Sequence, residues 1–345
     1  MARSDIHRLR NPLSDLYGQS SVWAAYFVLR GWALYGLAFA LAAFAHPLWL
    51  RAVGAVVLAP AIALLFRIAH DCGHDCHFRG RGMNRLAGRL CLLPAYHPHE
   101  AWIRLHNHRH HAFTNLRGRD YIWVPLSKAE YDRMGVLGRL RERVYRTTAG
   151  VGLYYLHGVW WRQMIGSEPP VQARVRQRAA LDRALVLAFF GLQLAALSLG
   201  RPSASDYLLR VLLCLILPFL GFNWMVGFVS FLNHTHPQIP WFARRRAWSF
   251  YAGQVGCTAH VRPPPWLFLF LTDLGRHGAH HIAPQVPIAA LPKAEARLEA
   301  LTGEAVRERW SLRRHREIMR CCKLYDYDGR FWMDFKGRAT TPSLL

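Results

Sequence analysis

Histidines lie in dense groups along this chain of 345 residues. Of the 19 histidines, nine fall between His70 and His111 and six between His234 and His281. His70 and His74, in the segment "HDCGH", are four residues apart, a spacing that places both imidazoles on one face of a helix. Imidazole is the commonest metal ligand among protein side chains. One such pair is weak evidence for a metal site, because a lone histidine pair on a helix more often packs in the core or lies on the surface; several such groups together predict one.

The second group is the segment "HNHRHH". It places His106 and His110 four residues apart, with His108 and His111 beside them. Because residues four apart share a helix face, we expect His106 and His110 to point the same way.

Two further groups lie near the C-terminal third of the chain. The segment "HGAHH" contains His277, His280 and His281, whose spacing can present three ring nitrogens to one side of a helix. His234 and His236 follow an apolar run in the segment "NHTH". Eight or nine imidazoles are too many for one zinc ion, which takes four ligands, and they suit two metal ions. Imidazole serves zinc, copper, iron and nickel, so ligand type alone leaves the metal open.

Apolar stretches long enough to cross a membrane precede these groups. A transmembrane helix needs about 20 apolar residues. Four candidate spans meet or approach that length, roughly residues 22–46, 50–69, 184–200 and 207–232. We therefore predict an all-α integral membrane protein with about four transmembrane helices.

The links between the spans predict the topology. The short links "PLWLR" and "RPSASDY" pair the spans into two hairpins, whereas residues 70–183 carry about twenty Arg and Lys. The positive-inside rule then places both termini, residues 70–183 and residues 233–345 in the cytoplasm. Both histidine-rich windows begin at the cytoplasmic end of a span, so we expect them to meet at one membrane face. The expected location is a bacterial inner membrane or an equivalent membrane.

Composition argues against a nucleic-acid-binding protein and against a disulfide-stabilised one. The net charge of +23 is spread between apolar stretches in a chain that is 52% hydrophobic. This distribution argues for membrane topology and against nucleic-acid binding. The seven cysteines are odd in number and form no disulfide framework, which favours ordinary thiols in a reducing compartment.

The remaining segments complete a single expected domain over residues 1–345. The stretches "LAGRLCLLPAY" and "GVGLYYLHGVWW" are too short to span and predict helices lying along the bilayer surface. We expect a cytosolic helical cap that carries the histidine groups. After residue 285 the pattern becomes polar and helical, which fits a part of this cap or, equally well, a solvated charged tail helix.

The motifs resemble those of the membrane fatty acid desaturase family, which is marked by the three histidine boxes H-x(3–4)-H, H-x(2–3)-H-H and [HQ]-x(2)-H-H. Here they are "HDCGH", "HNHRHH" and "HGAHH". The segments "HTHPQIPW" and "HHIAPQVP" also resemble the Δ12/ω3 methyl-end branch of acyl-lipid desaturases. The resemblance covers roughly residues 50–300.

The resemblance implies a di-iron centre. The second box fits the spacing with three intervening residues, and a further histidine after the last span matches His234 best. The implied ligands are His70, His74, His106, His110, His111, His234, His277, His280 and His281.

Neighbouring polar residues are candidates for contacts with these ligands. Metal-bound histidines usually donate their second N–H to a carboxylate or carbonyl, a role that suits Asp71 and Asp273. His108 and His236 are spare histidines, and Asn233 is a candidate for a water-mediated contact. The neighbouring His77, His97, His99 and His260 are expected to be structural.

The activity implied is O2-dependent desaturation, which introduces a cis double bond into a long-chain acyl-lipid or acyl-CoA. It needs two iron ions cycling between Fe2+ and Fe3+, O2 as co-substrate, a membrane lipid substrate and a separate electron donor of ferredoxin, rubredoxin or cytochrome b5 type. The alternative is a di-iron membrane hydroxylase or ketolase acting on a lipid or carotenoid. A metal transporter would carry histidines or acids inside its spans, and these spans have almost none. Double-bond position, chain length and headgroup depend on tunnel shape, which no motif reports.

Overall fold

The structure is a computed structural model that describes residues 7–18, 21–166, 172–262, 276–302 and 306–344. Contacts within the chain define two compact units. Unit 1 comprises Met1–Tyr17, Leu105–Tyr155 and Gly227–Leu345. Unit 2 comprises Gly18–Arg104 and Leu156–Val226. The chain passes between the units within α5, η4 and α11.

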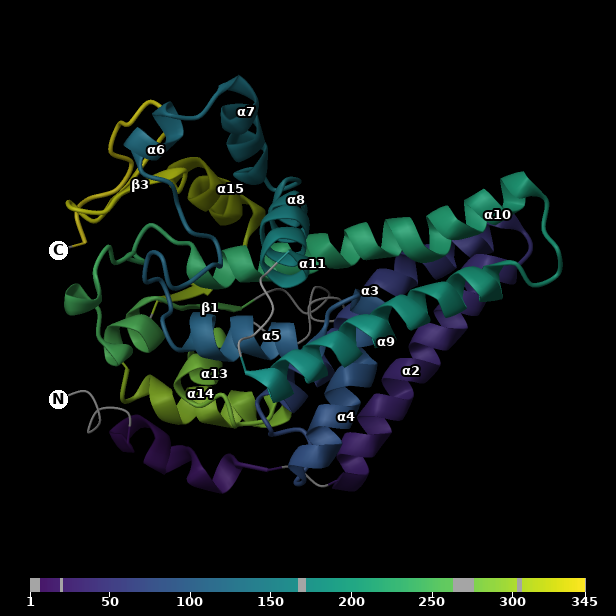
Figure 1. Ribbon diagram of the computed structural model, residues 1–345. Helices are drawn as coiled ribbons and strands as arrows, with labels where there is room; N and C mark the ends of the chain where they lie inside the picture. The colour runs from purple at the N-terminus through teal and green to yellow at the C-terminus, as the bar shows by residue number, and fades with distance from the viewer. Residues whose placement is uncertain (1–6, 19–20, 167–171, 263–275, 303–305, 345) are drawn as a thin grey trace. The chain divides into compact units, whose positions relative to one another are not determined.

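Unit 2 is built from long helices. Its elements, in chain order, are α2 (Ser21–Phe44), α3 (Leu48–Gly73), α4 (Arg81–Leu92), the short η2 (Leu93–Ala95), α5 (His99–Leu105), the π-helix η4 (Tyr154–Ile165), α9 (Ala173–Leu197), α10 (Ala204–Val211), the π-helical turn η5 (Leu212–Ile216) and α11 (Leu217–His234). Figure 1 shows α2 and α9 as long rods, and α10 continues without a break through η5 into α11.

Four helical stretches of the described residues are long and apolar enough to cross a membrane. They are Ser21–Phe44, Leu48–Gly73, Ala173–Leu197 and Ala204–His234. The expectation of four candidate spans in a mainly helical protein is confirmed. The third helix starts 11 residues before the predicted 184–200, because its first turns are rich in Arg and Ala. These residues favour helix but lower hydropathy.

Helices α2 and α3 pack closely through small residues. A Cβ atom added at Gly54 of α3 would lie 2.5 Å from the backbone nitrogen of Ala42 in α2. Small residues allow such close backbone approach between membrane helices. Arg51 of α3 is buried, donates to the carbonyl of Ala42 and pairs with Asp206 of α10 at 2.6 Å. The ends of these helices are thus tied together by a charged contact.

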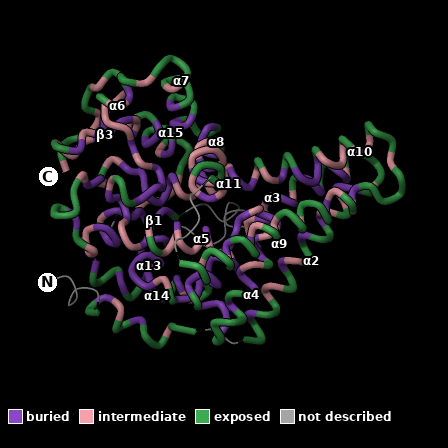
Figure 2. The backbone as a smooth tube through the Cα atoms, viewed as in Figure 1, coloured by how far each residue is buried: buried purple, intermediate pink, exposed green. Residues whose placement is uncertain are grey.

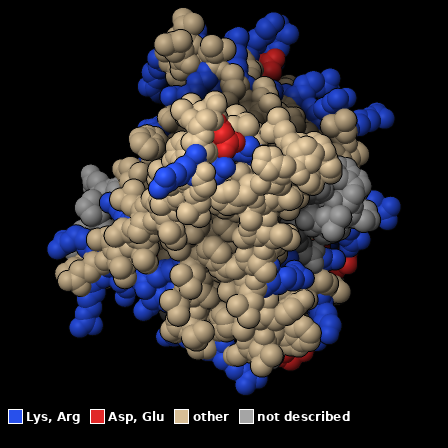
Figure 3. All heavy atoms as spheres, turned by 90° about the vertical axis from the view of Figure 1, so that its right-hand side faces the viewer, with Lys and Arg blue, Asp and Glu red and all other residues tan. Residues whose placement is uncertain are grey.

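The outer surfaces of the long helices are apolar. On α2, Leu29 and Leu37 are 70% and 69% exposed, and on α9 Leu187 is 70% exposed. Figure 2 shows exposed backbone along α9 and α10, and uncharged residues cover most of the face in Figure 3. Contiguous exposed apolar surface of this kind marks a membrane or protein contact.

Unit 1 combines short helices with four short strands. Its elements are η1 (Asn11–Leu16), the π-helix η3 (His106–His111), α6 (Lys128–Asp132), α7 (Val136–Tyr145), α8 (Val151–Leu153), η6 (Arg245–Ala247), the π-helical η7 (Ala252–Gly256), β1 (Ala259–Arg262), α13 (His277–Ile282), η8 (Ile288–Ala290), α14 (Leu291–Glu299), β2 (Val306–Arg309), α15 (Leu312–Cys321), β3 (Leu324–Asp326) and β4 (Phe331–Met333).

The strands correct the expectation of an all-α chain. Strands β1 and β2 pair in parallel, with His260 opposite Arg307, and β3 and β4 form an antiparallel pair. The β1–β2 pairing joins segments that are distant in sequence, so no local pattern predicts it. The β3–β4 pair is joined by "YDGR", whose Asp-Gly step is a recognised turn signal that the helical pattern of the preceding residues obscured.

An apolar cluster packs against one side of α13. Ala279 and Ile282 of α13 are buried against Leu291, Ala294 and Leu298 of α14, together with other members of the cluster, Leu9, Leu13, Val255, Ala283, Val286 and Ile288. Because this contact occupies one side of α13, its histidines are directed to the remaining sides.

Candidate metal centre

Four buried imidazoles of unit 1 form a compact group, which we call the quartet. His110 comes from η3, His234 ends α11, and His277 and His281 lie one turn apart in α13. Each offers a ligand atom within 4.8 Å of those of the other three. The Nε2 atom of His277 lies 2.8 Å from Nε2 of His234 and 3.0 Å from Nε2 of His281.

The second ring nitrogen of three quartet members faces a hydrogen-bond acceptor. Nδ1 of His110 lies 3.0 and 3.2 Å from the two carboxylate oxygens of Asp120. Nδ1 of His234 lies 3.3 Å from the carbonyl oxygen of Cys257. An ionised carboxylate and a carbonyl oxygen only accept, so in both histidines Nδ1 carries the proton.

The third case is His281. Its Nδ1 lies 2.8 Å from Oε1 of Gln254 and 3.2 Å from the Thr114 hydroxyl. The Gln254 amide is oriented because its Nε2 donates to the carbonyl of His111 at 2.8 Å, which leaves Oε1 to accept from His281. Proton placement on Nδ1 leaves Nε2 with its lone pair, the form that binds metal.

At His281 of the quartet, burial and the neighbouring imidazoles favour the neutral ring. Burial lowers the pKa of His281 well below its usual range, and the neighbouring His277, His110, His234 and His280 lower it further. Metal ligation requires neutral imidazole. Nitrogen lone pairs about 3 Å apart repel one another unless a cation lies between them, so the donor set fits a metal ion.

A second group in unit 1, which we call the trio, consists of His106, His111 and His280. Nε2 of His111 lies 3.1 Å from Nε2 of His106 and 3.1 Å from Nε2 of His280. His111 and His280 are buried and His106 is half-buried. The trio is also a set of closely spaced nitrogen donors.

A π-helix decides which histidine of the second box joins which group. Its hydrogen bonds join residues five apart, so His106 and His111, not His106 and His110, meet in the trio. His110 turns instead to the quartet. The rings of His106 and His110 are neighbours, with centroids 5.6 Å apart, but the two histidines join different groups, which the sequence did not predict.

The third box is divided in the same way. His277 and His281 belong to the quartet, whereas His280 belongs to the trio. The predicted presentation of all three to one side is thus replaced by a division between two groups. The ordinary α-helix α13 serves both, because successive residues differ by about 100° around its axis.

The first box lies in unit 2. His70 occupies the last turn of α3, and His74 caps the C-terminal end of that helix. Their ring centroids are 4.9 Å apart, and the ring of Trp102 lies 5.6 Å from that of His70. Both histidines are buried. The predicted i, i+4 proximity of this pair is present in the fold.

Comparison with known proteins identifies the family. The model of the fatty acid desaturase family matches residues 47–313, which include parts of both units and the nine histidines of the implied ligand set. The chain belongs to the fatty acid desaturase family. Its class, an oxidoreductase acting on fatty acyl groups, is confirmed.

Named relatives support the Δ12/ω3 branch of that family. The chain is 28% identical to an sn-1 oleoyl-lipid 12-desaturase of Picosynechococcus over 77% of this chain and 74% of the relative. It is 27% identical to a chloroplastic omega-6 fatty acid desaturase of Spinacia oleracea, over 79% and 58% respectively. An sn-1 acyl-lipid omega-3 desaturase (ferredoxin) of Synechocystis is 28% identical over 88% and 82%. The matches span less than two thirds of the chloroplastic relatives' length.

The structure places the residues that were predicted to contact the implied ligands of this desaturase in different environments. Asp71 lies 3.5 Å from Nδ1 of His70, at the edge of hydrogen-bonding distance. His108 is exposed and Asn233 is buried. Nε2 of His236 lies 3.2 Å from Glu308, so this histidine joins an ion-pair cluster instead of either group. Asp273 lies outside the described residues.

The sequence predictions missed Asp120, Gln254 and Thr114, which the structure places against histidines of the quartet in this desaturase. Asp120 accepts hydrogen bonds from the backbone nitrogens of Asn115, Tyr121 and Ile122 as well as from His110. Thr114 stands four residues after His110, a helical spacing that could have signalled it. Asp120 and Gln254 stand at no such distance from a histidine box, and only folding brings these two to the site.

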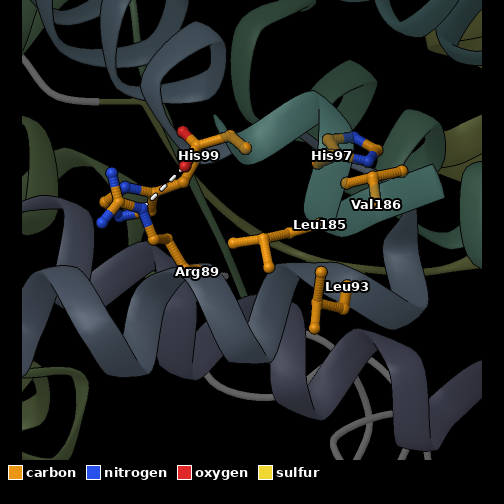
Figure 4. Close-up of a pocket in the computed structure, with 7 residues that line it drawn as sticks. Arg89, Leu93, His97, His99, Leu185 and Val186 are labelled. Atoms are coloured by element: carbon orange, nitrogen blue, oxygen red, sulfur yellow. Dashed lines mark hydrogen bonds and ion pairs between the residues drawn. The ribbon is translucent and has the colours of Figure 1, made fainter. Parts of the chain in front are cut away.

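Unit 2 of the desaturase also contains a small pocket, drawn in Figure 4. Its lining includes Arg89, His97, His99 and Asp182, and the dashed line joins Arg89 to Asp182 at 2.6 Å. The pocket has room for about one water molecule. It is far too small for an acyl chain and is not a substrate site.

Proposed function

We propose that this desaturase introduces a cis double bond into the acyl chain of a membrane lipid, with O2 as co-substrate. The observation that carries the proposal is the convergence of seven imidazoles in the quartet and the trio, within a chain of this family. The acyl-lipid substrate is inferred from relatives named as oleoyl-lipid and acyl-lipid desaturases.

The proposed cofactor is a pair of iron ions. The quartet would hold one ion and the trio the other, with His70 and His74 of the first box completing the ligand set. When bound, iron would supply the O2 activation that removes hydrogen from an unactivated methylene pair, chemistry that side chains lack. Asp120, Gln254 and the Cys257 carbonyl hold the protons on Nδ1, so that Nε2 remains a donor atom. The buried surroundings of these ligands exclude water.

The proposed topology places four helices across the bilayer in two hairpins, with both termini and the histidine boxes in the cytoplasm. Close α2–α3 packing and the Arg51–Asp206 ion pair support it. Reporter fusions in the links at 45–47 and 198–203 would score as external, and fusions at either terminus as cytoplasmic. A cytoplasmic signal from the links would refute the hairpins.

The proposed electron donor is a separate acidic carrier of the ferredoxin type. One relative is named as a ferredoxin-dependent omega-3 desaturase, and the net charge of +23 would attract an acidic partner. We expect the rate of electron transfer from ferredoxin to fall steeply between low and physiological salt. A rate independent of salt would refute electrostatic docking.

Expression in a host with simple lipids, followed by mass spectrometry of its fatty acids, tests the reaction. Desaturation lowers the product mass by two hydrogens, whereas the alternative hydroxylation adds one oxygen. A His110→Ala variant provides the inactive control. An unchanged lipid profile from protein that retains iron would refute the acyl-lipid substrate.

A further inference from the structure

An ion-pair triad built on the buried carboxylate of Glu295 flanks the third histidine box. Glu295 of α14 accepts a hydrogen bond from Nδ1 of His260 at 2.8 Å through one carboxylate oxygen. Its other oxygen pairs with Nε of Arg276 at 2.8 Å. Arg276 immediately precedes His277, and His260 lies in β1. The Glu295 carboxylate thus links Arg276, the residue before the box, to His260 of β1.

His260 also touches the box directly. A Cβ atom added at Gly278 would lie only 2.1 Å from Nε2 of His260 and 2.7 Å from its Cε1. Such approaches are far shorter than van der Waals contact, so only glycine fits between His277 and the two later histidines. The imidazole of His260 therefore packs directly against the backbone of α13 at Gly278.

Helix α13 needs such external support. It has six residues, and its N-cap residue Arg276 makes no side-chain capping hydrogen bond. Isolated helices shorter than about 12 residues are marginal in water. The rotation of α13 nevertheless has to be fixed, because it directs His277 and His281 to the quartet and His280 to the trio.

We propose that Glu295 and His260 are positioning residues that set the rotation of α13 and thereby divide the third histidine box between the two groups. The inference rests on the proposed metal centre and extends it to residues outside the boxes. Burial alone would raise the pKa of Glu295, but the hydrogen bond and charge of His260 and the charges of Arg276 and Arg262 lower it, which keeps the carboxylate ionised.

The test compares Glu295→Gln with Glu142→Gln in the full-length protein purified in detergent. Glu142 is a matched control, because it is a buried unit 1 carboxylate that pairs with Arg146 at 2.9 Å instead of flanking a histidine box. Three measurements are made: hydrogen exchange of residues 277–282 in the metal-free protein, affinity for Fe(II) under anaerobic conditions, and absorption of bound Co(II), which reports the coordination geometry.

In Glu295→Gln we expect exchange in α13 to rise at least about tenfold, because a buried ion pair is broken. We expect Fe(II) affinity to fall by roughly 10–100-fold, as for other residues that orient metal ligands, and the Co(II) spectrum to change. Glu142→Gln should leave all three at wild-type values. Equal exchange of α13 in the two variants, or an unchanged Fe(II) affinity in Glu295→Gln, would overturn the positioning role.

A double-mutant cycle tests the steric contact and remains decisive if Glu295→Gln folds poorly. Gly278→Ala should increase α13 exchange strongly, whereas adding His260→Ala should relieve the clash, so that the double variant exchanges no faster than His260→Ala alone. Additive effects would refute the contact. If wild-type protein bound neither Fe(II) nor Co(II), the proposed metal centre would fail, while selective exchange changes would still support positioning of α13.

Discussion

Replacement of Asp120 by asparagine should weaken one of the two groups and spare the other. Asp120 is 3% exposed, and its carboxylate accepts from Nδ1 of His110 and from three backbone nitrogens. Oδ1 accepts from Tyr121 and Ile122, whereas Oδ2 accepts from Asn115 at 2.8 Å. In either orientation of the Asn amide, its NH2 group therefore meets a backbone N–H.

The expected magnitude follows from the lost contact. A hydrogen bond to a charged group contributes about 1.5–3 kcal/mol. Since about 1.4 kcal/mol is a factor of ten, metal affinity at the quartet should fall by roughly 10–100-fold. The trio contains no histidine that contacts Asp120, so its affinity should remain near that of the wild type.

The assay is anaerobic Fe(II) titration against a competing chelator, which counts the ions bound and separates steps that differ in affinity. Wild-type protein should bind two ions, and Asp120→Asn should bind one of them more weakly. Asp132→Asn is the control, because Asp132 is half exposed and pairs with Lys128 on the surface, where an ion pair contributes less than about 1 kcal/mol. Equal titration curves for Asp120→Asn and wild type would refute the assigned role of Asp120.

Three further predictions concern other contacts. Gln254→Leu removes the acceptor for Nδ1 of His281 and should also weaken Fe(II) at the quartet roughly 10-fold, measured by the same titration. Asp206→Asn leaves the buried Arg51 without its carboxylate and should lower the free energy of unfolding in detergent by about 1–3 kcal/mol, with no change in metal content. Burial lowers the pKa of His99 to about 4, although the charge of Asp182 raises it. The folded protein therefore takes up this proton less readily than the unfolded chain. His99 costs no stability above pH 6.5, and the free energy of unfolding falls as the pH drops from 6.5 toward 4. His99→Gln should therefore reduce the acid-induced loss of unfolding free energy by up to about 3 kcal/mol; an equally steep loss in the variant would contradict this.

The spans and boxes were predictable because each depends on a local pattern. Runs of about 20 apolar residues predict spans, and histidines three to five residues apart predict neighbouring ligands. It was not predictable which histidines of one box would join the quartet and which the trio. The turn that carries His110 and His111 becomes a π-helix, and side chains distant in sequence or beyond the turn satisfy its carbonyls: Thr114 donates to the His110 carbonyl at 2.9 Å and Gln254 to that of His111 at 2.8 Å.

The partners of the clustered histidines were harder to predict than the clusters themselves. Asp71 is adjacent to a box in sequence, yet it lies 3.5 Å from His70, whereas Asp120, ten residues from His110, contacts it at 3.0 Å. His236, two residues from His234, is occupied by Glu308 and Arg314. Sequence proximity is a poor guide here, because a side chain's partner depends on which direction the chain takes after the box.

Helix α13 links the two groups mechanically. His280 lies between His277 and His281 in sequence, yet it serves the trio while they serve the quartet. A rotation of α13 by one residue, about 100°, would remove donors from both groups at once. Loss of the two metals in variants that loosen α13 should therefore be concerted, whereas changes at Asp120 or Gln254, which hold single histidines of the quartet, should remove one metal before the other. The number of steps in a Fe(II) titration thus distinguishes a displaced helix from a misoriented ring.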